Sequence, residues 1–353
     1  RDRNMIEIID TIDKFKTLEI EWNSLFHNAN DVTFFQTFKY NWIAWETFAT
    51  PNDKLYIIIY RTNDKELQAI FPFYINGKGF LKFINDRHTD FCNIIISKEV
   101  VAIYNLMNDV WKFVEEDKLI RFLLLDNVVS NSPILAYWKV FQGNAFVFSQ
   151  TEHSWLNCPK SESIFSEFRH LNAKERKRLV TLDKKSVQCN MKIFNIANEP
   201  YPEHVINRII QLMIDSGLRS SSYLNDTMRL FMRKLYENGL VELPVLYDNG
   251  EPISLGFVFV NEQRTYSMRW VILYKSGQFN LWNNVRYIVE KSQIGSSVVD
   301  FGRGGYDYKM QNFRPQVENL YRFMASKTKW GNWYVLFKIA ASHMRKTLKK
   351  YKG

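Results

Sequence analysis

The sequence has few of the residues that build disulfide frameworks or metal sites. Its 353 residues include only three cysteines, which are odd in number and widely spaced at Cys92, Cys158 and Cys189. This spacing excludes a disulfide scaffold and a CxxC metal knuckle, and the six histidines form no HExxH pattern. We therefore expect no bound metal, and a reducing, cytoplasmic compartment.

Long apolar runs are also missing. The longest, such as residues 55–60 and 122–125, are far shorter than the roughly 20 residues that span a bilayer. No charged and then apolar leader precedes residues 5–8. We expect no transmembrane segment and no secretion signal.

Hydrophobic residues make up 46% of the chain and aromatic residues 16%, which is enough for large cores and excludes a disordered chain. The length favours about two domains. The net charge of +10 is uneven: residues 1–150 hold 16 Lys/Arg against 19 Asp/Glu, whereas the remainder holds 31 against 18. The excess of basic residues lies in 169–192 and 327–353. Such clusters are typical either of solvent-exposed helix faces or of surfaces that bind an anionic partner.

The chain contains the same order of predicted elements twice. Each half has a strand, helical segments, a hairpin, a third extended run, a helix and a strand, and the second hairpin has the Asn249-Gly250 pair that such turns favour. We interpret this order as a duplicated α/β module. The predicted elements are 5–9, 12–26, 38–49, 55–61, 67–75, 80–84, 103–116 and 121–125 in the first copy, and 190–196, 203–215, 226–238, 240–247, 253–260, 265–272, 280–293 and 297–301 in the second.

This order of elements is that of the GNAT acyltransferases, and three segments carry a closer resemblance. RHLNAKERKRLVTL at Arg169–Leu182 resembles the basic helix of the CelD-like and FemAB-like branch. The stretch DFGRGGYDYK at Asp300–Lys309 resembles that branch's strand end followed by Tyr-Lys. Its amino-terminal signature is similar to WNSL at 22–25, FFQT at 34–37 and WIAW at 42–45.

The resemblance implies an α/β (α+β) fold with two tandem GNAT-like domains, each a mixed twisted sheet flanked by helices. Residues 1–150 would form a degenerate GNAT-like domain and residues 151–330 the acyltransferase domain that binds acyl-CoA. Residues 331–353 would form a basic amphipathic carboxy-terminal helix. The activity implied is transfer of an acyl group from acetyl-CoA or a longer acyl-CoA to the amine of a nucleotide-linked amino sugar, for surface polysaccharide (O-antigen) synthesis.

The expected donor site lies in the second copy. A helix N-terminus suits an anion such as the CoA pyrophosphate, and Gly277 permits close backbone approach there while Asn280 is an N-cap candidate. The first copy has Glu99 at the equivalent place, which disfavours an anion. The expected donor-binding residues, with the strand edge for pantetheine, are Trp270, Val271, Ile272, Lys275, Ser276, Gly277, Gln278, Phe279 and Asn280.

The expected catalytic residues follow partly from the resemblance. Lys309 would stabilise the developing oxyanion, or would only pair with Asp300 or Asp307. His88, Asp90 and Asp307, or an ordered water chain, are candidate proton acceptors, although His88 is also typical of a structural histidine. The residues expected to bind the acceptor are Arg219, Tyr223, Arg303, Tyr306 and Asp307.

Two rival functions stay open. The same fold serves FemAB-like enzymes that use aminoacyl-tRNA to build peptidoglycan bridges, which would make nucleic acid a partner. Such enzymes usually carry a long coiled-coil arm, and this chain has no heptad run of that length. The other rival is a non-enzymatic module that binds nucleic acid or a membrane. Residues 333–348 could lie on a membrane as an amphipathic helix, although docking of that helix onto the body is favoured.

Overall fold

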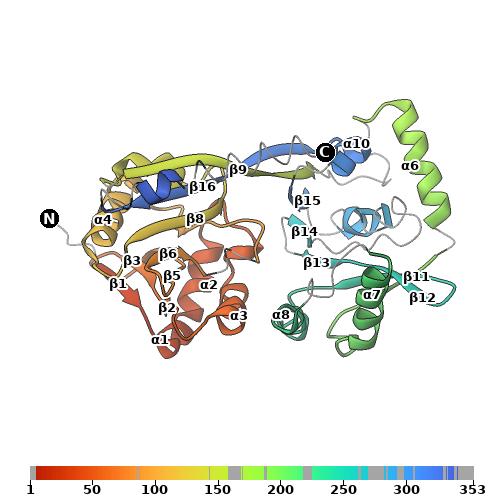
Figure 1. Cartoon of the computed structure of the whole chain (residues 1–353), viewed down its shortest axis with the longest axis horizontal. Helices are drawn as coiled ribbons and strands as arrows, with labels where there is room; N and C mark the ends of the chain where they lie inside the picture. The colour runs from red at the N-terminus through yellow and green to blue at the C-terminus, as the bar shows by residue number, and fades with distance from the viewer. Residues whose placement is uncertain are drawn as a thin grey trace. The chain divides into compact units, whose positions relative to one another are not determined.

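The protein is described here from a computed structural model, shown in Figure 1. It divides into two compact units, Arg1–Thr151 with Asn319–Gly353, and Glu152–Glu318. The residues that the structure describes are 5–84, 86, 88–142, 144–157, 168, 170–186, 189–217, 225–260, 264–268, 282–283, 285–291, 298–304, 307–328, 331, 333–337 and 340.

Unit 1 begins with one strand, which is followed by three α-helices and a short 3-10 helix before the next strand. The periodic apolar positions of these helices supply its core, and Thr37 caps the start of α3 through its side chain. Its elements are β1 (Met5–Ile9), α1 (Ile12–Thr17), α2 (Glu19–His27), η1 (Phe34–Gln36), α3 (Phe38–Phe48), β2 (Lys54–Leu55), β3 (Ile57–Arg61), β4 (Leu67–Phe71), β5 (Phe73–Ile75), β6 (Phe80–Phe83), β7 (Ile95–Ile96), α4 (Ile103–Glu116), β8 (Phe122–Val128), α5 (Pro133–Ala136) and η2 (Trp138–Val140).

Unit 2 repeats the pattern. Asn249 and Gly250 both have positive φ, 50° and 83°, as a two-residue hairpin turn between β11 and β12 requires. The elements that follow along the chain are β9 (Asn144–Asn157), α6 (Ala173–Ser186), β10 (Asn190–Phe194), α7 (Glu203–Asp215), α8 (Asp226–Glu237), β11 (Leu243–Asp248), β12 (Glu251–Leu255), β13 (Phe257–Val260), β14 (Arg264–Met268), helical residues 282–283 and 285–291, β15 (Val298–Arg303), α10 (Asp307–Phe313) and β16 (Gln316–Ser326). Of these, β9 belongs to unit 2 from Glu152 onward, and β16 belongs to unit 1 from Asn319 onward.

The two units share a strand order, to which unit 1 adds β7 and β2. Unit 1 has an antiparallel sheet, β1-β3-β4-β7, and a mixed set, β2-β5-β6-β8-β16, in which only β6 and β8 are parallel. Unit 2 has an antiparallel sheet, β10-β11-β12, and a mixed set, β13-β14-β15-β9, in which only β14 and β15 are parallel. This likeness confirms the predicted fold class of two tandem modules with mixed sheets.

The last strand of each mixed set comes from the other half of the sequence. β9 follows β8 along the chain but pairs with β15, and β16 follows β15 but pairs with β8. For this reason residues 319–353 group with unit 1, whereas the sequence-based domain assignment placed 319–330 with the second domain.

Each unit has its own aromatic-rich core. In unit 1 the indole of Trp111 on α4 stacks on Phe323 of β16, with ring centroids 5.8 Å apart. In unit 2 Trp282 is fully buried and packs on Phe168. Burying such side chains stabilises each unit by about 1.5–3 kcal/mol per large residue.

Candidate active site

The candidate site of unit 2 lies where two parallel strands diverge. β14 and β15 pair from Arg264 opposite Val298 to Tyr266 opposite Asp300. Beyond this point β14 continues beside β13, with Met268 opposite Phe257. β15 continues beside β9, with Arg303 opposite His153. Among the described residues the two parallel strands therefore separate at Asp300, and the DFGRGG stretch begins at the point of separation.

The glycines of this stretch form a bulge in β15. Asp300 lies opposite Trp155 and Arg303 opposite His153, so three steps along β15 match two along β9. Gly302 takes a φ of 70° at the bulge, and the fully buried Asp300 accepts a hydrogen bond of 2.7 Å from its N–H. Gly304, with a φ of 100°, donates to the Glu152 carbonyl at 2.6 Å. The backbone carbonyls after Asp300 consequently turn to one side.

Lys309 lies on that side, in the first turn of α10. Its ammonium is 2.8 Å from the Phe301 carbonyl oxygen and 3.1 Å from that of Gly304. It is 3.3 Å from the Arg303 carbonyl and 3.5 Å from that of Gly302. An ammonium has three protons, so these four acceptors engage all of its donors, and only 5% of the residue is exposed. We call residues 300–304 with Lys309 the lysine corner.

The position of α10 is fixed by ring packing beneath the lysine corner. Phe313, which is 2% exposed, stacks on Phe301 with centroids 5.4 Å apart. Its carbonyl oxygen is 2.6 Å from Nε2 of His170. The corner is thus held from both ends, by Lys309 at the start of α10 and by Phe313 at its end.

Two residues that the sequence analysis did not identify as functional, a histidine and a glutamate, lie beside the lysine corner. His153, 3% exposed, lies on β9 opposite Arg303, and its Nε2 is 3.1 Å from a carboxylate oxygen of Glu318. The ring also stacks on Trp155, with centroids 5.0 Å apart. The two partners are 165 residues apart in sequence, so no local pattern connects them, and the burial pattern along β9 does not alternate at His153.

The equivalent divergence in unit 1 is filled by the chain itself. β6 and β8 pair only at Phe80–Phe122 and Leu81–Leu123. Farther along β8, Cys92 lies beside this strand in the place that β6 leaves. Its N–H donates to the Asn127 carbonyl at 2.8 Å, and it forms a parallel bridge to Val128. Cys92 is fully buried. A pantetheine arm therefore finds no free strand edge at this place in unit 1.

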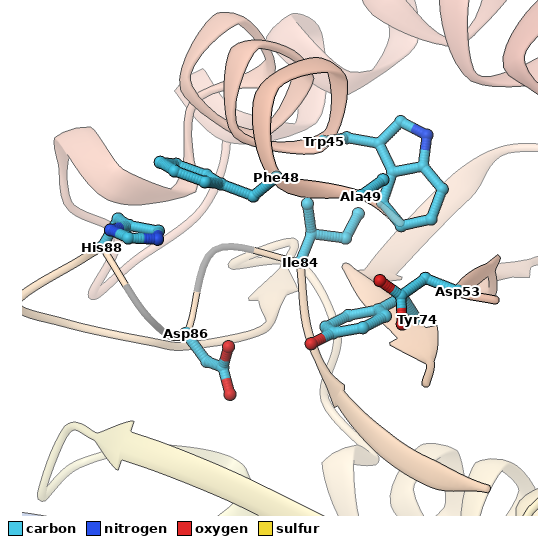
Figure 2. A pocket seen from close by; sticks show the side chains of 8 residues that line it. All are labelled: Trp45, Phe48, Ala49, Asp53, Tyr74, Ile84, Asp86 and His88. Carbon is cyan, nitrogen blue, oxygen red and sulfur yellow. The ribbon is translucent and has the colours of Figure 1, made fainter. Parts of the chain in front are cut away.

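The two predicted proton acceptors lie in unit 1, near a small pocket (Figure 2). His88 lines the pocket and stacks on Phe48, with centroids 3.5 Å apart, while its carbonyl accepts a 2.7 Å bond from the Tyr40 hydroxyl. Asp90 is buried at 5% exposure and does not line it. The pocket residues are Trp45, Phe48, Ala49, Asp53, Tyr74, Ile84, Asp86 and His88.

This pocket is too small for a sugar as it stands. It leaves about 10 Å³ of room for the centre of a water molecule, roughly enough for a single water. Figure 2 shows the His88 and Phe48 rings together on one side, with Asp86 below them. Asp86 forms a buried ion pair with Lys82, so its charge is already compensated.

Of the residues predicted to bind the acceptor, two are described: Arg303 is half-buried at the end of β15, and Asp307 begins α10. The predicted residues outside the described ranges are Trp270, Val271, Ile272, Lys275, Ser276, Gly277, Gln278, Phe279 and Asn280 of the donor site, and Arg219, Tyr223 and Tyr306 of the acceptor site.

Within the described ranges, no helix is long and apolar enough to span a bilayer. No group of three or more His, Cys, Asp or Glu side chains there is arranged to bind a metal ion.

Comparison with known proteins places the fold. No protein-family model matches the sequence, and no curated protein matches it. Solved structures do match: FemX has a TM-score of 0.59 at 10% identity, over 91% of this chain and 96% of that one. L-PGS from Bacillus licheniformis matches at 0.56 and 11%, over 90% and 93%. A tandem GNAT protein from the clavulanic acid biosynthesis pathway matches at 0.53 and 10%, over 92% and 99%.

These likenesses span nearly the whole of each chain. Together with the repeated strand order, they define the class: the chain has a tandem GNAT-like fold. At about one identical residue in ten, they establish the fold alone.

Proposed function

We propose that the protein is an acyl-CoA-dependent N-acyltransferase whose donor site is in unit 2. The observation that carries this proposal is the contrast between the two parallel strand pairs. In unit 2 the pair separates at the lysine corner, whereas in unit 1 Cys92 and its neighbours occupy the corresponding strand edge. Among the described residues, only unit 2 leaves this edge of its parallel pair to the amides of a single pantetheine arm.

The donor would bind along β14 and over the following helix. We assign the pantetheine to Trp270, Val271 and Ile272, which follow β14. The pyrophosphate is assigned to residues 275–280, which precede the helical residues 282–291. Backbone N–H groups and the helix dipole favour an anion at such an N-terminus.

The chemistry needs little beyond positioning. The neutral amine nitrogen attacks the thioester carbonyl carbon, a C–N bond forms, the C–S bond breaks, and CoA leaves as a thiol after the amine has lost a proton. Holding the two reactants together supplies much of the rate. Lys309 holds the lysine corner beside the reacting carbonyl and contributes positive charge as the oxyanion develops.

The acceptor we propose is the amine of a nucleotide-linked amino sugar. Arg219 and Arg303 suit a diphosphate because guanidinium groups bind such oxygens bidentately, and Tyr223 suits stacking on a base or sugar. Tyr306 and Asp307 complete the proposed acceptor site. Of the candidate proton acceptors, Asp307 belongs to the same unit as the proposed donor site, whereas His88 and Asp90 are proposed from the sequence alone. The product would serve surface polysaccharide synthesis.

One observation favours a second candidate, an aminoacyl-tRNA donor. Helix α6, green in Figure 1, exposes six basic side chains, Lys174, Arg176, Lys177, Arg178, Lys184 and Lys185. Its two acids are engaged elsewhere: Glu175 pairs with Arg314 at 2.6 Å, and Asp183 pairs with Arg286 at 3.0 Å. The outer face of α6 is therefore strongly positive, as a phosphate backbone requires.

Thermal denaturation with a panel of ligands tests the proposal. A ligand at a hundred times its dissociation constant adds about 2.7 kcal/mol of stability. We expect an acyl-CoA and a nucleotide sugar each to raise the melting temperature of the protein. No shift with any acyl-CoA, together with a salt-sensitive shift with aminoacyl-tRNA, would replace the first candidate by the second.

A further inference from the structure

The carboxy-terminal helix is attached to unit 1 by a tight joint after β16. Ser326 Oγ donates to the Thr328 carbonyl at 3.1 Å and accepts from the Thr328 N–H at 3.2 Å. Gly331 then donates to Thr328 Oγ1 at 3.0 Å. A Cβ atom at Gly331 would lie 1.9 Å from Ser326 Oγ and 2.9 Å from the Phe122 ring, so only glycine fits there.

The next residues set the rotation of this helix. Val335 is 1% exposed. The ring of Tyr334 packs near those of Phe122 and Phe80, with centroids 5.4 and 6.1 Å away. With the joint at Gly331 and these two contacts in place, the helix presents one defined side to unit 1.

That rotation leaves a large apolar face uncovered. Trp333 is 71% exposed, Phe337 66% and Leu336 43%. Successive helical residues turn by about 100°, so Trp333 and Phe337 lie on one side, away from Val335, and the exposed Ala340 continues it. We call Trp333, Leu336, Phe337 and Ala340 the outer face. The prediction that this face docks onto the body is wrong with respect to unit 1, on which the helix packs by its other side through Tyr334 and Val335.

The surrounding charge identifies the kind of partner. Residues 327–353 contain eight Lys/Arg and no Asp or Glu. Tryptophan, phenylalanine and leucine beside lysines are typical of helices that lie in a membrane interface, where anionic lipids attract the basic side chains. Leucine and alanine on the same stripe suit acyl chains better than stacked bases, which need isolated aromatic platforms.

We infer that the outer face docks the protein onto the surface of an anionic lipid bilayer. The aromatic side chains enter the interface, and the net positive charge of residues 327–353 attracts the anionic headgroups. This inference does not depend on the transferase proposal, because the helix belongs to unit 1 and the proposed donor site to unit 2.

Co-sedimentation with vesicles of phosphatidylglycerol and phosphatidylcholine tests the inference. The parent should bind them, and added salt should weaken its binding. Trp333→Ser with Phe337→Ser should lower the partition coefficient roughly ten-fold or more, since two large side chains no longer leave water. Ile20→Ser is the matched control, because Ile20 is 83% exposed on α2, and it should bind like the parent.

The controls separate the other possible partners. The double variant (Trp333→Ser with Phe337→Ser) and the Ile20→Ser control should keep the parent melting temperature, because the side chains that change are exposed. If the double variant does not fold, Trp333→Ser alone replaces it. Parent-like vesicle binding by a folded variant that carries Trp333→Ser and Phe337→Ser, or by the single variant that replaces it, would overturn the inference. So would a parent dimer in sedimentation velocity that this variant dissociates, since a second copy would then cover the face.

Discussion

The ammonium of Lys309 donates to the backbone carbonyl of Phe301, eight residues earlier in the chain, at 2.8 Å. Three further carbonyls, those of residues 302, 303 and 304, lie within 3.5 Å of the same nitrogen. A single side chain therefore holds the turn that closes β15 at the point where β14 departs from it. The Lys309 ammonium therefore fixes the backbone of this turn, and in our proposal it also stabilises the oxyanion of the reaction.

Replacing Lys309 with methionine should destabilise unit 2. Buried carbonyls lose their donor, which typically costs about 1–3 kcal/mol, whereas the methionine retains the apolar stem of the side chain. The melting temperature should fall, and Lys174→Met, on the exposed face of α6, is the control that should not change it. An unchanged melting temperature for Lys309→Met would contradict the structural role.

The same variant tests catalysis when it is assayed below its melting temperature. If Lys309 also stabilises the oxyanion, the single-turnover rate should fall about 10²–10³-fold, while the affinity for CoA changes little. A folded variant with the parent rate would restrict Lys309 to holding the corner. Weaker CoA binding at an unchanged rate would instead make it a phosphate contact.

Replacing Gly277 with valine should remove the stabilisation by CoA. The branched side chain would crowd the backbone where the diphosphate must approach. The matched control is Glu99→Val in the equivalent loop of unit 1, where Glu99 is exposed, and it should respond to CoA like the parent. Normal CoA binding by Gly277→Val would show that the pyrophosphate binds elsewhere.

Local periodicity predicted the helices and most strands well. The helices at Ile103–Glu116 and Glu203–Asp215 begin and end where the sequence indicates, because their apolar residues recur at helical spacing. The predicted helix at 12–26 is instead two helices that meet at Leu18, whose N–H bonds back to Phe15 and Lys16.

The exchanged strands and the lysine corner were harder to predict. β9 and β16 find their partners in the opposite half of the chain, and the rows of half-buried residues along them have no strong apolar alternation. The pairing of His153 with Glu318 depends on these strands. Lys309 was identified as important, but its carbonyl partners depend on the positive φ angles of Gly302 and Gly304, which sequence does not specify.

Charge removal on α6 should separate the two candidate donors. Lys177→Gln, Arg178→Gln and Lys184→Gln lower the local field without touching the lysine corner. We expect acyl transfer to a small amine to be unchanged and the protein to stay folded, because these residues are exposed. A large loss of turnover, with tight salt-sensitive RNA binding by the parent, would favour the tRNA donor.

A parallel prediction concerns the carboxy-terminal lysines. Lys346→Gln, Lys349→Gln and Lys350→Gln together should leave turnover of a small sugar substrate intact, since the donor site is assigned to the other unit. The same triple variant should bind anionic vesicles less tightly than the parent. Loss of turnover in solution, without lipid, would mean that the basic tail contributes to substrate binding.

Buried tyrosines should resist alkaline titration. Burial raises the pKa of Tyr236 from 10.0 to about 12, and burial also raises the pKa values of Tyr56, Tyr201 and Tyr287. Since the folded-state pKa is the higher one, Tyr236 contributes its full stability below pH 10 and loses it between about pH 10 and 12. Phenolate absorbance recorded with circular dichroism checks this. Ionisation of all 18 tyrosines near pH 10 in a folded protein would contradict it.

The most direct test is a transfer assay with two alternative donors. The protein is incubated with a nucleotide-linked amino sugar and either an acyl-CoA or an aminoacyl-tRNA, and the product is identified by mass spectrometry while released CoA thiol is counted. Our account predicts one acylated amine for each CoA released, and loss of this product in Gly277→Val. Aminoacyl transfer from tRNA with no release of CoA from any acyl-CoA would contradict it.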